Sequence, residues 1–207
     1  MELQYYGANC VRISTKKAQV VVDDNLEKLG LKSVTKPSDI CLHTFKDVPA
    51  HECIFEAEMP GEYEVAGVSI RGIAARAHMD EEGKQSAVIY VVSADDTRVA
   101  VIGHIHPNLS DDQVEEIGLV DVAVIPVGNS GYTLDGIGAL QVIKKIEPKV
   151  VIPTHYADKA VKFEVAQAEL AEAFKGLAME PAETISKFKT TAGELSDTTK
   201  LIVLERQ

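Results

Sequence analysis

Apolar and polar stretches alternate through the middle of the chain in an order that predicts strand, helix and strand. The run Val99–Ile102 is apolar and mostly β-branched, which is typical of a buried strand. After a polar turn, Ser110 is followed by two aspartates, and this order predicts a helix with a capping serine and an acidic first turn. The helix is expected over Ser110–Gly118, and Val122–Val127 is expected to form the next buried strand. Segment 99–127 therefore predicts a βαβ-like unit, a fold element whose ligands collect beyond the carboxyl ends of the strands.

The first half of the chain is rich in stretches of strand length. Strands are expected at Leu3–Ser14, Ala18–Asp23, Asp39–Thr44, Cys53–Ala57, Val68–Arg76, Ala87–Ser93 and Arg98–Ile102. Helical spacing appears only later, over Leu134–Ile146 and Val161–Phe174, and further strands are expected at Lys149–Ile152, Thr184–Lys189 and Lys200–Glu205. Because strands come first and helices are inserted between the later ones, the pattern predicts a layered sandwich of two sheets with helices outside, not a doubly wound parallel sheet.

Length and composition are those of an ordinary globular protein. The chain has 207 residues, of which 45% are hydrophobic, so residues 1–207 are expected to form a single domain. The net charge of -11 argues against a nucleic-acid-binding surface, which needs clustered Lys and Arg. Three cysteines without a CxxC pair argue against a disulfide framework. The first residues do not form a signal-peptide pattern and no apolar run reaches membrane length, so a cytoplasmic protein is expected.

Histidines follow several of the expected strands. Of the six in the chain, four stand just after apolar runs: His78, His104, His106 and His155. Imidazoles at strand exits in separate segments are a common way to assemble a metal site, and three of these predict one: His78, His104 and His155. The alternative is that each is a partly buried, hydrogen-bonded side chain, because spacing alone does not show that they converge.

The remaining histidines are weaker candidates for the same site. His104 and His106 lie two positions apart and would share one face of a strand, but a proline follows and predicts that the strand ends there. His43 and His51 flank Asp47 in an expected loop, where all three could add ligands. A solvated loop is the favoured interpretation of that segment.

Six stretches of the chain carry a family resemblance that extends over nearly its whole length. They are 3–10 (LQYYGANC), 20–23 (VVVD), 39–42 (DICL), 60–68 (PGEYEVAGV), 120–128 (VDVAVIPVG) and 148–156 (PKVVIPTHY). Together they resemble the metallo-β-lactamase-fold hydrolases, in particular a small bacterial branch similar to the ascorbate-phosphate lactonase-like proteins. The resemblance implies an α/β (α+β) fold, an αββα four-layer sandwich of two mixed β-sheets, with a metal site at one edge and metal-dependent hydrolysis as the family activity.

The resemblance also identifies where the chain departs from the family pattern. The family's leading metal motif, HxHxDH, falls on Phe45, Asp47, Pro49 and Ala50. His78 and His155 match two of the family's metal histidines, and His104 stands where the family has a bridging aspartate. A neutral imidazole does not supply the charge with which a carboxylate bridges two cations, so a binuclear site is not expected. The resemblance therefore implies a single cation bound by these three histidines. Imidazole ligands suit zinc, or nickel or copper.

Two hypotheses about function follow from these observations. The first is a divergent protein of the metal-dependent hydrolase family, with altered or lost catalysis and at most one bound metal. The alternative is an active mononuclear metal-dependent hydrolase of a small substrate, phosphorylated or a lactone. The missing HxHxDH motif favours the first and predicts no β-lactamase activity. Either way the expected partner is a small-molecule ligand, with neither nucleic acid nor membrane, and the oligomeric state is left open.

Overall fold

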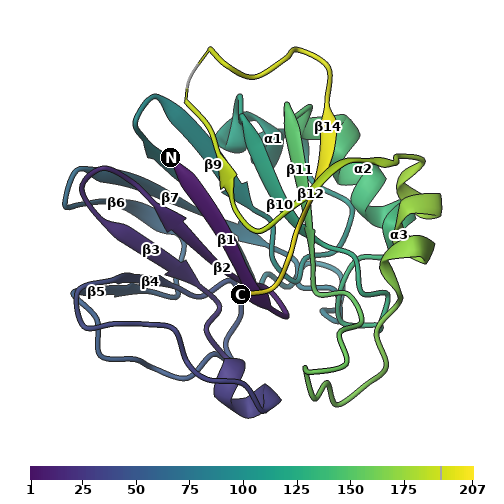
Figure 1. The fold of residues 1–207 in the computed structure, drawn as a ribbon, viewed down its shortest axis with the longest axis horizontal. Helices are drawn as coiled ribbons and strands as arrows, with labels where there is room; N and C mark the ends of the chain where they lie inside the picture. The colour runs from purple at the N-terminus through teal and green to yellow at the C-terminus, as the bar shows by residue number, and fades with distance from the viewer. Residues whose placement is uncertain (192) are drawn as a thin grey trace.

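The computed structural model describes residues 1–191 and 193–207, and its strands form two sheets that share one core (Figure 1). The six-stranded sheet has the order β13 (Phe188–Lys189), β1 (Glu2–Gly7), β2 (Cys10–Ser14), β3 (Gln19–Val22), β4 (Ile40–Leu42) and β5 (Phe55–Ala57). The eight-stranded sheet has the order β12 (Pro181–Ile185), β14 (Lys200–Leu204), β11 (Val150–Thr154), β10 (Val122–Pro126), β9 (Thr97–Val101), β8 (Ala87–Ala94), β7 (Val68–Ala75) and β6 (Gly61–Val65). Both sheets contain parallel and antiparallel pairs, so the predicted sandwich of two mixed sheets is confirmed.

The alternation of side chains along the strands explains how the sheets pack. In β1, Leu3 and Tyr5 point into the core between the sheets, while Gln4 and Tyr6 lie on the outer face and are half-buried. In β10 and β11 every residue is buried, as expected for central parallel strands that are covered on both faces. The core is one cluster of buried apolar residues that runs from Leu3 to Leu204.

Helices cover the outer face of the eight-stranded sheet. α1 (Asp111–Ile117) contacts β7, α2 (Gly136–Ile146) contacts β10, and α3 (Leu170–Leu177) packs against α2. In Figure 1 α2 and α3 lie together at the right of the molecule. The two helices approach closely through Gly136 and Gly176, since a Cβ added to Gly136 would lie 2.5 Å from the carbonyl oxygen of Ala173.

A loop and a short 3-10 helix cover the outer face of the six-stranded sheet. The 3-10 helix η1 (Leu26–Leu29) places Leu26 against Cys10 and Val21, which point outward from β2 and β3. Leu31 and Val34, from the loop that follows η1, pack against this cluster. The fourth layer of the sandwich is therefore built from this segment.

The predicted βαβ-like unit is confirmed. β9 and β10 are parallel neighbours, and α1 connects them. The side chain of Ser110 accepts a hydrogen bond from the backbone N–H of Gln113, and the Gln113 side chain accepts one from the backbone N–H of Ser110. This capping box satisfies N–H groups that the first turn of a helix leaves without partners.

Two predicted strands divide in the structure. The prediction of a single strand at Leu3–Ser14 is wrong, because the chain turns after β1. At this turn Gly7 and Ala8 have φ of 122° and 48°. The strand expected at Thr184–Lys189 is also wrong, because β12 ends at Ile185 and belongs to the eight-stranded sheet, whereas β13 belongs to the other. In the first place Gly7, Ala8 and Asn9, which are typical of turns, separate the two runs of β-forming residues.

The helix predicted at Val161–Phe174 is also wrong over most of its length. α3 begins only at Leu170, and the preceding residues form a loop. Backbone N–H groups of this loop donate to distant carbonyls, from Lys162 to Leu29 at 2.9 Å and from Ala168 to Gly128 at 2.7 Å. These tertiary hydrogen bonds replace those of a helix, so the tertiary context overrides the helical spacing.

Candidate functional site

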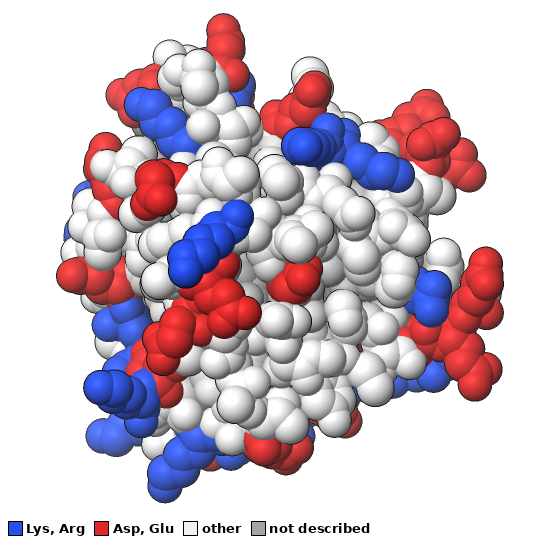
Figure 2. Space-filling view, turned by 90° about the vertical axis from the view of Figure 1, so that its right-hand side faces the viewer, with Lys and Arg blue, Asp and Glu red and all other residues white. Residues whose placement is uncertain are grey.

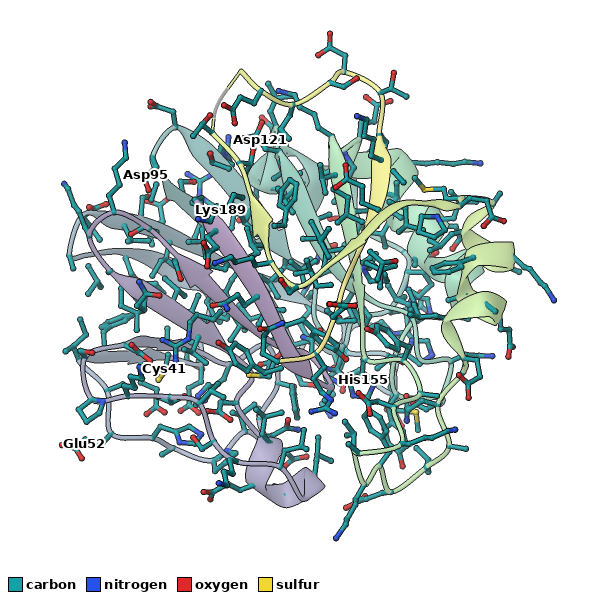
Figure 3. The ribbon with its side chains drawn as sticks, in the orientation of Figure 1. Cys41, Glu52, Asp95, Asp121, His155 and Lys189 are labelled. Carbon is teal, nitrogen blue, oxygen red and sulfur yellow. The ribbon has the colours of Figure 1, made fainter. Side chains whose placement is uncertain are left out.

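Three strand exits meet at one edge of the eight-stranded sheet. β7, β9 and β11 run in the same direction, so their carboxyl ends lie at the same edge, and His78, His104 and His155 follow these strands. The backbone N–H of His78 donates to the carbonyl oxygen of His104 at 2.9 Å, and Ala77 pairs with Ile105 in a short bridge. Figure 3 labels His155 at this edge, where β11 ends.

Four aromatic rings form a continuous series at this edge. The centroids of Phe45 and His104 are 4.3 Å apart, those of His104 and His155 are 4.9 Å apart, and those of His155 and Phe163 are 5.0 Å apart. We call these four side chains the ring row. Phe45 follows β4 in the six-stranded sheet, and Phe163 comes from the loop before α3. The ring row therefore joins both sheets with a loop from the helical layer.

His155 is held in a strained but well-bonded conformation. Its φ of 56° lies in the left-handed region, and its backbone N–H donates to the carbonyl of Ala8 at 2.6 Å. Its Nδ1 lies 3.1 Å from the amide oxygen of Gln167, which can only accept, so Nδ1 carries the proton and Nε2 keeps a lone pair. Burial lowers the pKa of His155 to about 4, and the ring is neutral at pH 7.

His104 and His78 each have a ring nitrogen without a partner. Nδ1 of both side chains is buried and has no hydrogen bond to any described residue. Burial, together with the neighbouring rings of His155 and His78, lowers the pKa of His104 well below its usual value. These two ring nitrogens are therefore available to bind a ligand or a cation.

A buried polar network lies behind the ring row. Asp23 accepts hydrogen bonds from the Asn9 amide at 2.6 Å and from both the hydroxyl and the backbone N–H of Thr44, at 2.6 and 2.7 Å. The hydroxyl of Thr154 donates to the amide oxygen of Asn9 at 2.7 Å. Burial raises the pKa of Asp23 to about 6, against the lowering effect of these donors. Since Thr154 belongs to one sheet and the other three residues flank strands of the other, the network ties the two sheets together at the site.

A match to a known family identifies the superfamily of this chain. Residues 2–155, about three quarters of the chain, match the model of a family described as the β-lactamase superfamily domain. This chain belongs to the β-lactamase superfamily. The matched residues include β1 to β11 and the three histidines at the sheet edge, so the resemblance to this superfamily is confirmed.

Relatives of this superfamily member agree on the fold. A protein of Archaeoglobus fulgidus named as a metal-dependent hydrolase is 26% identical over 126 residues, which are 56% of this chain and 54% of the relative, so the match spans about half of each. A Thermotoga maritima crystal structure, described as a proposed Zn-dependent hydrolase of the metallo-β-lactamase superfamily, is 25% identical with a TM-score of 0.76, over 100% of this chain and 99% of that chain. A metal-dependent hydrolase structure from Parabacteroides distasonis, also a proposed assignment, is 14% identical with a TM-score of 0.68, over 99% and 93% of the two chains, and supports the fold alone.

Membership of the superfamily implies a bound metal. The side chains that could donate to it determine whether one or two cations fit. In the described part of the chain, no group of three or more His, Cys, Asp or Glu side chains is arranged to hold a metal ion. At a position of the leading metal motif, Phe45 provides a phenyl ring that packs on His104. As they stand, the described side chains therefore assemble no complete metal centre, whether for one cation or for two. The ring separation of His104 and His155 is compatible with two imidazoles on one cation, and the three-histidine ligand set stays a prediction.

The other candidate ligands have local partners. Nε2 of His43 lies 3.4 Å from a carboxylate oxygen of Glu56, and Nε2 of His51 lies 2.7 Å from the carbonyl of Asp24. Nδ1 of His106 accepts a hydrogen bond from the backbone of Asn108 at 3.3 Å. Asp47 is exposed. Burial lowers the pKa of His43 despite Glu56, so the proximity of the two does not amount to a strong ion pair.

Asp80 organises the loop that carries His78. Its carboxylate accepts hydrogen bonds from the backbone N–H of Ala77 at 3.1 Å and from the N–H and hydroxyl of Ser86 at 2.9 and 2.6 Å, and it lies 3.0 Å from the ammonium group of Lys84. Burial raises the pKa of Asp80, but these donors outweigh it and leave the pKa well below its usual range. The loop after β7 is therefore closed on a charged carboxylate.

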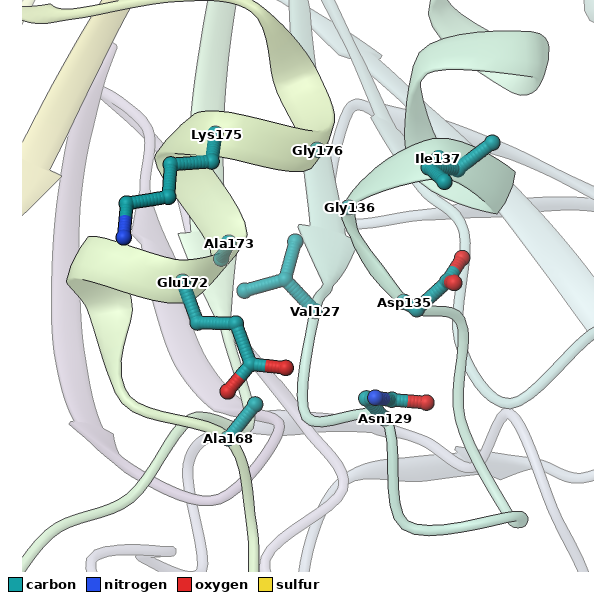
Figure 4. Close-up of a pocket in the computed structure, with 10 residues that line it drawn as sticks. All are labelled: Val127, Asn129, Asp135, Gly136, Ile137, Ala168, Glu172, Ala173, Lys175 and Gly176. Atoms are coloured by element: carbon teal, nitrogen blue, oxygen red, sulfur yellow. The ribbon is translucent and has the colours of Figure 1, made fainter.

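A hollow of about 380 Å³ lies beside the site, between the start of α2 and α3 (Figure 4). Its lining includes Asn129, Asp135 and Glu172, and Figure 4 shows the Glu172 carboxylate directed into the space. No member of the ring row lines it. Asp135 is already engaged as the cap of α2, where it accepts a hydrogen bond from the backbone of Gly138 at 2.7 Å.

Charged side chains on the face viewed in Figure 2 are mixed in sign. Lys and Arg side chains lie among Asp and Glu side chains, and this face carries no continuous basic surface. A protein that binds nucleic acid through this face would need such a surface. Among the described residues no helix combines the length and apolar character needed to span a membrane.

The sequence marks the three histidines as strand-exit residues, but it does not mark the residues that surround them in the structure. Asn9, Thr44 and Thr154 were not singled out, although each is a polar residue next to a strand end, which is the one signal that could have marked them. The contacts of Phe45 and Phe163 with imidazoles had no signal in the sequence, because they join segments far apart in the chain.

Proposed function

We propose that this chain is a divergent metal-dependent hydrolase homologue that has lost the two-metal hydrolysis typical of its superfamily and holds at most one cation, at His78, His104 and His155. The observation that carries the proposal is the packing of Phe45 on His104, with ring centroids 4.3 Å apart. A phenyl ring donates no electron pair to a metal, and here it lies against the imidazole that replaces the family's bridging carboxylate.

Acid–base chemistry by the site's own imidazoles is weak. A general base works best with a pKa near the operating pH, whereas burial lowers the pKa of His155 to about 4 and that of His104 well below its usual value. Neutral rings with such low pKa values remove few protons from a substrate or a water molecule. The low pKa values therefore suit these imidazoles to binding a metal rather than to removing a proton.

A second candidate function, a mononuclear hydrolase of a small phosphorylated or lactone substrate, is favoured by one specific observation. Nδ1 of His78 and Nδ1 of His104 have no partner among the described residues, and neutral imidazoles are the form that binds metals. A single zinc ion, when bound there, would polarise a substrate oxygen and lower the pKa of a water molecule. Gln167 would keep His155 oriented through the proton on Nδ1.

A hydrolysis assay with a restored motif tests the proposal. The wild-type protein, supplied with zinc or manganese, is expected to hydrolyse phosphodiester and lactone substrates at most feebly. A variant that carries the family ligands, Phe45→His, Asp47→His, Pro49→Asp and Ala50→His together with His104→Asp, is expected to bind a second metal ion and to gain activity that a chelator removes. Rapid turnover by the wild-type protein, abolished by chelator and restored by metal, would instead establish the mononuclear hydrolase.

The compartment we propose is the cytoplasm. Cys10, Cys41 and Cys53 are all free thiols in the structure, and unpaired cysteines are common where the surroundings keep thiols reduced.

A further inference from the structure

A second hollow, of about 570 Å³, lies on the outer face of the six-stranded sheet. Strand side chains that alternate away from the core form its floor, among them Gln4 of β1, Arg12 of β2 and Gln19 of β3. The loop after η1 forms its wall and includes Lys36 and Ser38. No residue of the ring row lines it, so this hollow is distinct from the candidate site described above.

The wall of this hollow is fixed by a buried carboxylate. Oδ2 of Asp24 accepts four hydrogen bonds from the loop: from the backbone N–H groups of Val34 and Thr35, both at 2.8 Å, and from the hydroxyls of Ser33 and Thr35, at 2.8 and 2.7 Å. Burial raises the pKa of Asp24, but these donors outweigh it and lower the pKa below its usual value. A loop held by so many bonds keeps its shape before any ligand arrives, which reduces the entropy lost on binding.

The floor contains a buried ion pair in which some hydrogen-bonding atoms have no partner. The guanidinium group of Arg12 lies 3.1 Å from Asp39, and the two side chains are 9% and 1% exposed. Arg12 also donates to the carbonyl of Val34, and Asp39 accepts from the backbone N–H of Lys36 at 2.9 Å. Nε of Arg12 and Oδ1 of Asp39 are both buried without a partner among the described residues. A buried donor of this kind is costly to leave unpaired.

Several hydrogen-bond donors around the hollow have no partner among the described residues. The amide oxygens of Gln4 and Gln19 already accept hydrogen bonds from Tyr6 and Ser14, and their NH₂ groups have no hydrogen bond to any described residue. The ammonium group of Lys36 and the hydroxyl of Ser38 likewise donate to no described residue. With Asp39 balancing one of two cations, the lining carries a net positive charge in a chain whose net charge is -11.

We propose that this hollow binds a small organic anion that presents several carboxylate or phosphate oxygens. Such oxygens accept hydrogen bonds from amide, hydroxyl and ammonium donors, and the excess of positive charge favours them over a neutral polyol. The volume exceeds that of one oxyanion group and leaves room for a short carbon skeleton. The ligand would contact both the sheet and the loop that Asp24 holds.

Titration with two anions tests the site, one of each chemistry: citrate as a carboxylate and inorganic phosphate. Binding is followed at low ionic strength by calorimetry and by backbone amide shifts in nuclear magnetic resonance. Saturable binding of either anion is expected, with shifts confined to Ser33–Asp39 and the neighbouring strand residues. Lys36→Ala is expected to weaken binding roughly tenfold, the loss typical of one charge-assisted hydrogen bond.

The matched control is Lys32→Ala, which removes the same charge from the same loop at an exposed residue that does not line the hollow. This variant is expected to change the affinity less than about twofold, as is typical of a distant exposed charge. Failure of both anions to saturate at millimolar concentration would overturn the proposal. An equal loss in the two lysine variants would overturn it as well, because it would mean diffuse attraction to the loop.

Discussion

The phenyl ring of Phe45 packs against the imidazole of His104, with 4.3 Å between centroids and 55° between the ring planes. Phe45 follows a strand of the six-stranded sheet and His104 follows a strand of the eight-stranded sheet, and the resemblance in sequence matches both to metal-ligand positions. An apolar ring in this place contributes to the burial that lowers the pKa of His104. The contact places an apolar ring where the resemblance expects a metal ligand and adds to the burial of His104.

Removal of the phenyl ring should therefore change the pKa of His104. Phe45→Ala is expected to raise the pKa of His104 towards its usual range, because water gains access to the imidazole. The loss of a half-buried ring should also lower the free energy of unfolding by about 1–3 kcal/mol. Histidine resonances followed across a pH titration, together with thermal unfolding, measure both effects.

Phe55→Ala is the matched control for this prediction. Phe55 also pairs with another aromatic ring, that of Tyr63 at 5.2 Å, but at a different strand. This variant should reduce stability while the pKa of His104 stays unchanged. An identical titration of His104 in wild type and Phe45→Ala would mean that the phenyl ring does not shield the imidazole.

His155 should make the metal-free protein less stable in acid. Its pKa is lowered from 6.5 to about 4, so below pH 6.5 the unfolded chain binds a proton that the folded chain does not. Stability is fully present above about pH 6.5 and falls by up to about 3 kcal/mol as the pH approaches 4. His155→Asn, whose side chain tolerates the left-handed backbone, should weaken this dependence in chemical unfolding at several pH values, while the part that comes from His104 remains.

Asp23 should act in the opposite direction over the same range. Its pKa is raised from 3.8 to about 6, so its contribution to stability is present below about pH 3.8 and is lost as the pH rises through 6. Asp23→Asn should consequently make the rise of stability between pH 4 and 6 steeper than in wild type. A flatter profile in this variant would contradict the assignment of a protonated Asp23 in the folded protein.

The loop that carries His78 should depend on Asp80. Asp80→Asn leaves the backbone N–H groups of Ala77 and Ser86 with a weaker acceptor, and a loss of about 1–3 kcal/mol is expected. Amide hydrogen exchange should accelerate between residues 77 and 86. Glu82→Gln, in an exposed part of the same loop, should leave exchange unchanged. Equal protection in wild type and Asp80→Asn would show that other contacts close the loop.

Thiol reactivity should distinguish the three cysteines. Cys10 and Cys41 are 0% and 2% exposed, and burial raises the pKa of both, whereas Cys53 is half-buried. A thiol reagent applied to the native protein is expected to modify no more than one site, at Cys53, and all three after unfolding. Mass spectrometry of the labelled peptides measures this, and rapid labelling of Cys10 in native protein would contradict the buried packing beneath η1.

Local signals in the sequence predicted much of this structure, and long-range contacts account for the failures. Ser110 and the residues after it specify a helix start through hydrogen bonds within one turn, so α1 was predictable. His78, His104 and His155 were predictable as strand-exit residues because parallel strands end at a common edge. The segment before α3 was not, since its backbone bonds go to Leu29 and Gly128. The same is true of the ring row, whose phenylalanines acquire their role only when four separate segments meet.

The metal content of the purified protein tests the central claim most directly. Protein produced without an affinity tag is equilibrated with zinc, freed of unbound metal and measured by elemental analysis against protein concentration. We expect at most one zinc per wild-type chain. His104→Ala is expected to lose that zinc, together with any zinc-dependent rise in melting temperature. Two zinc ions per wild-type chain would contradict the claim, because a binuclear centre would then exist despite the phenyl ring of Phe45.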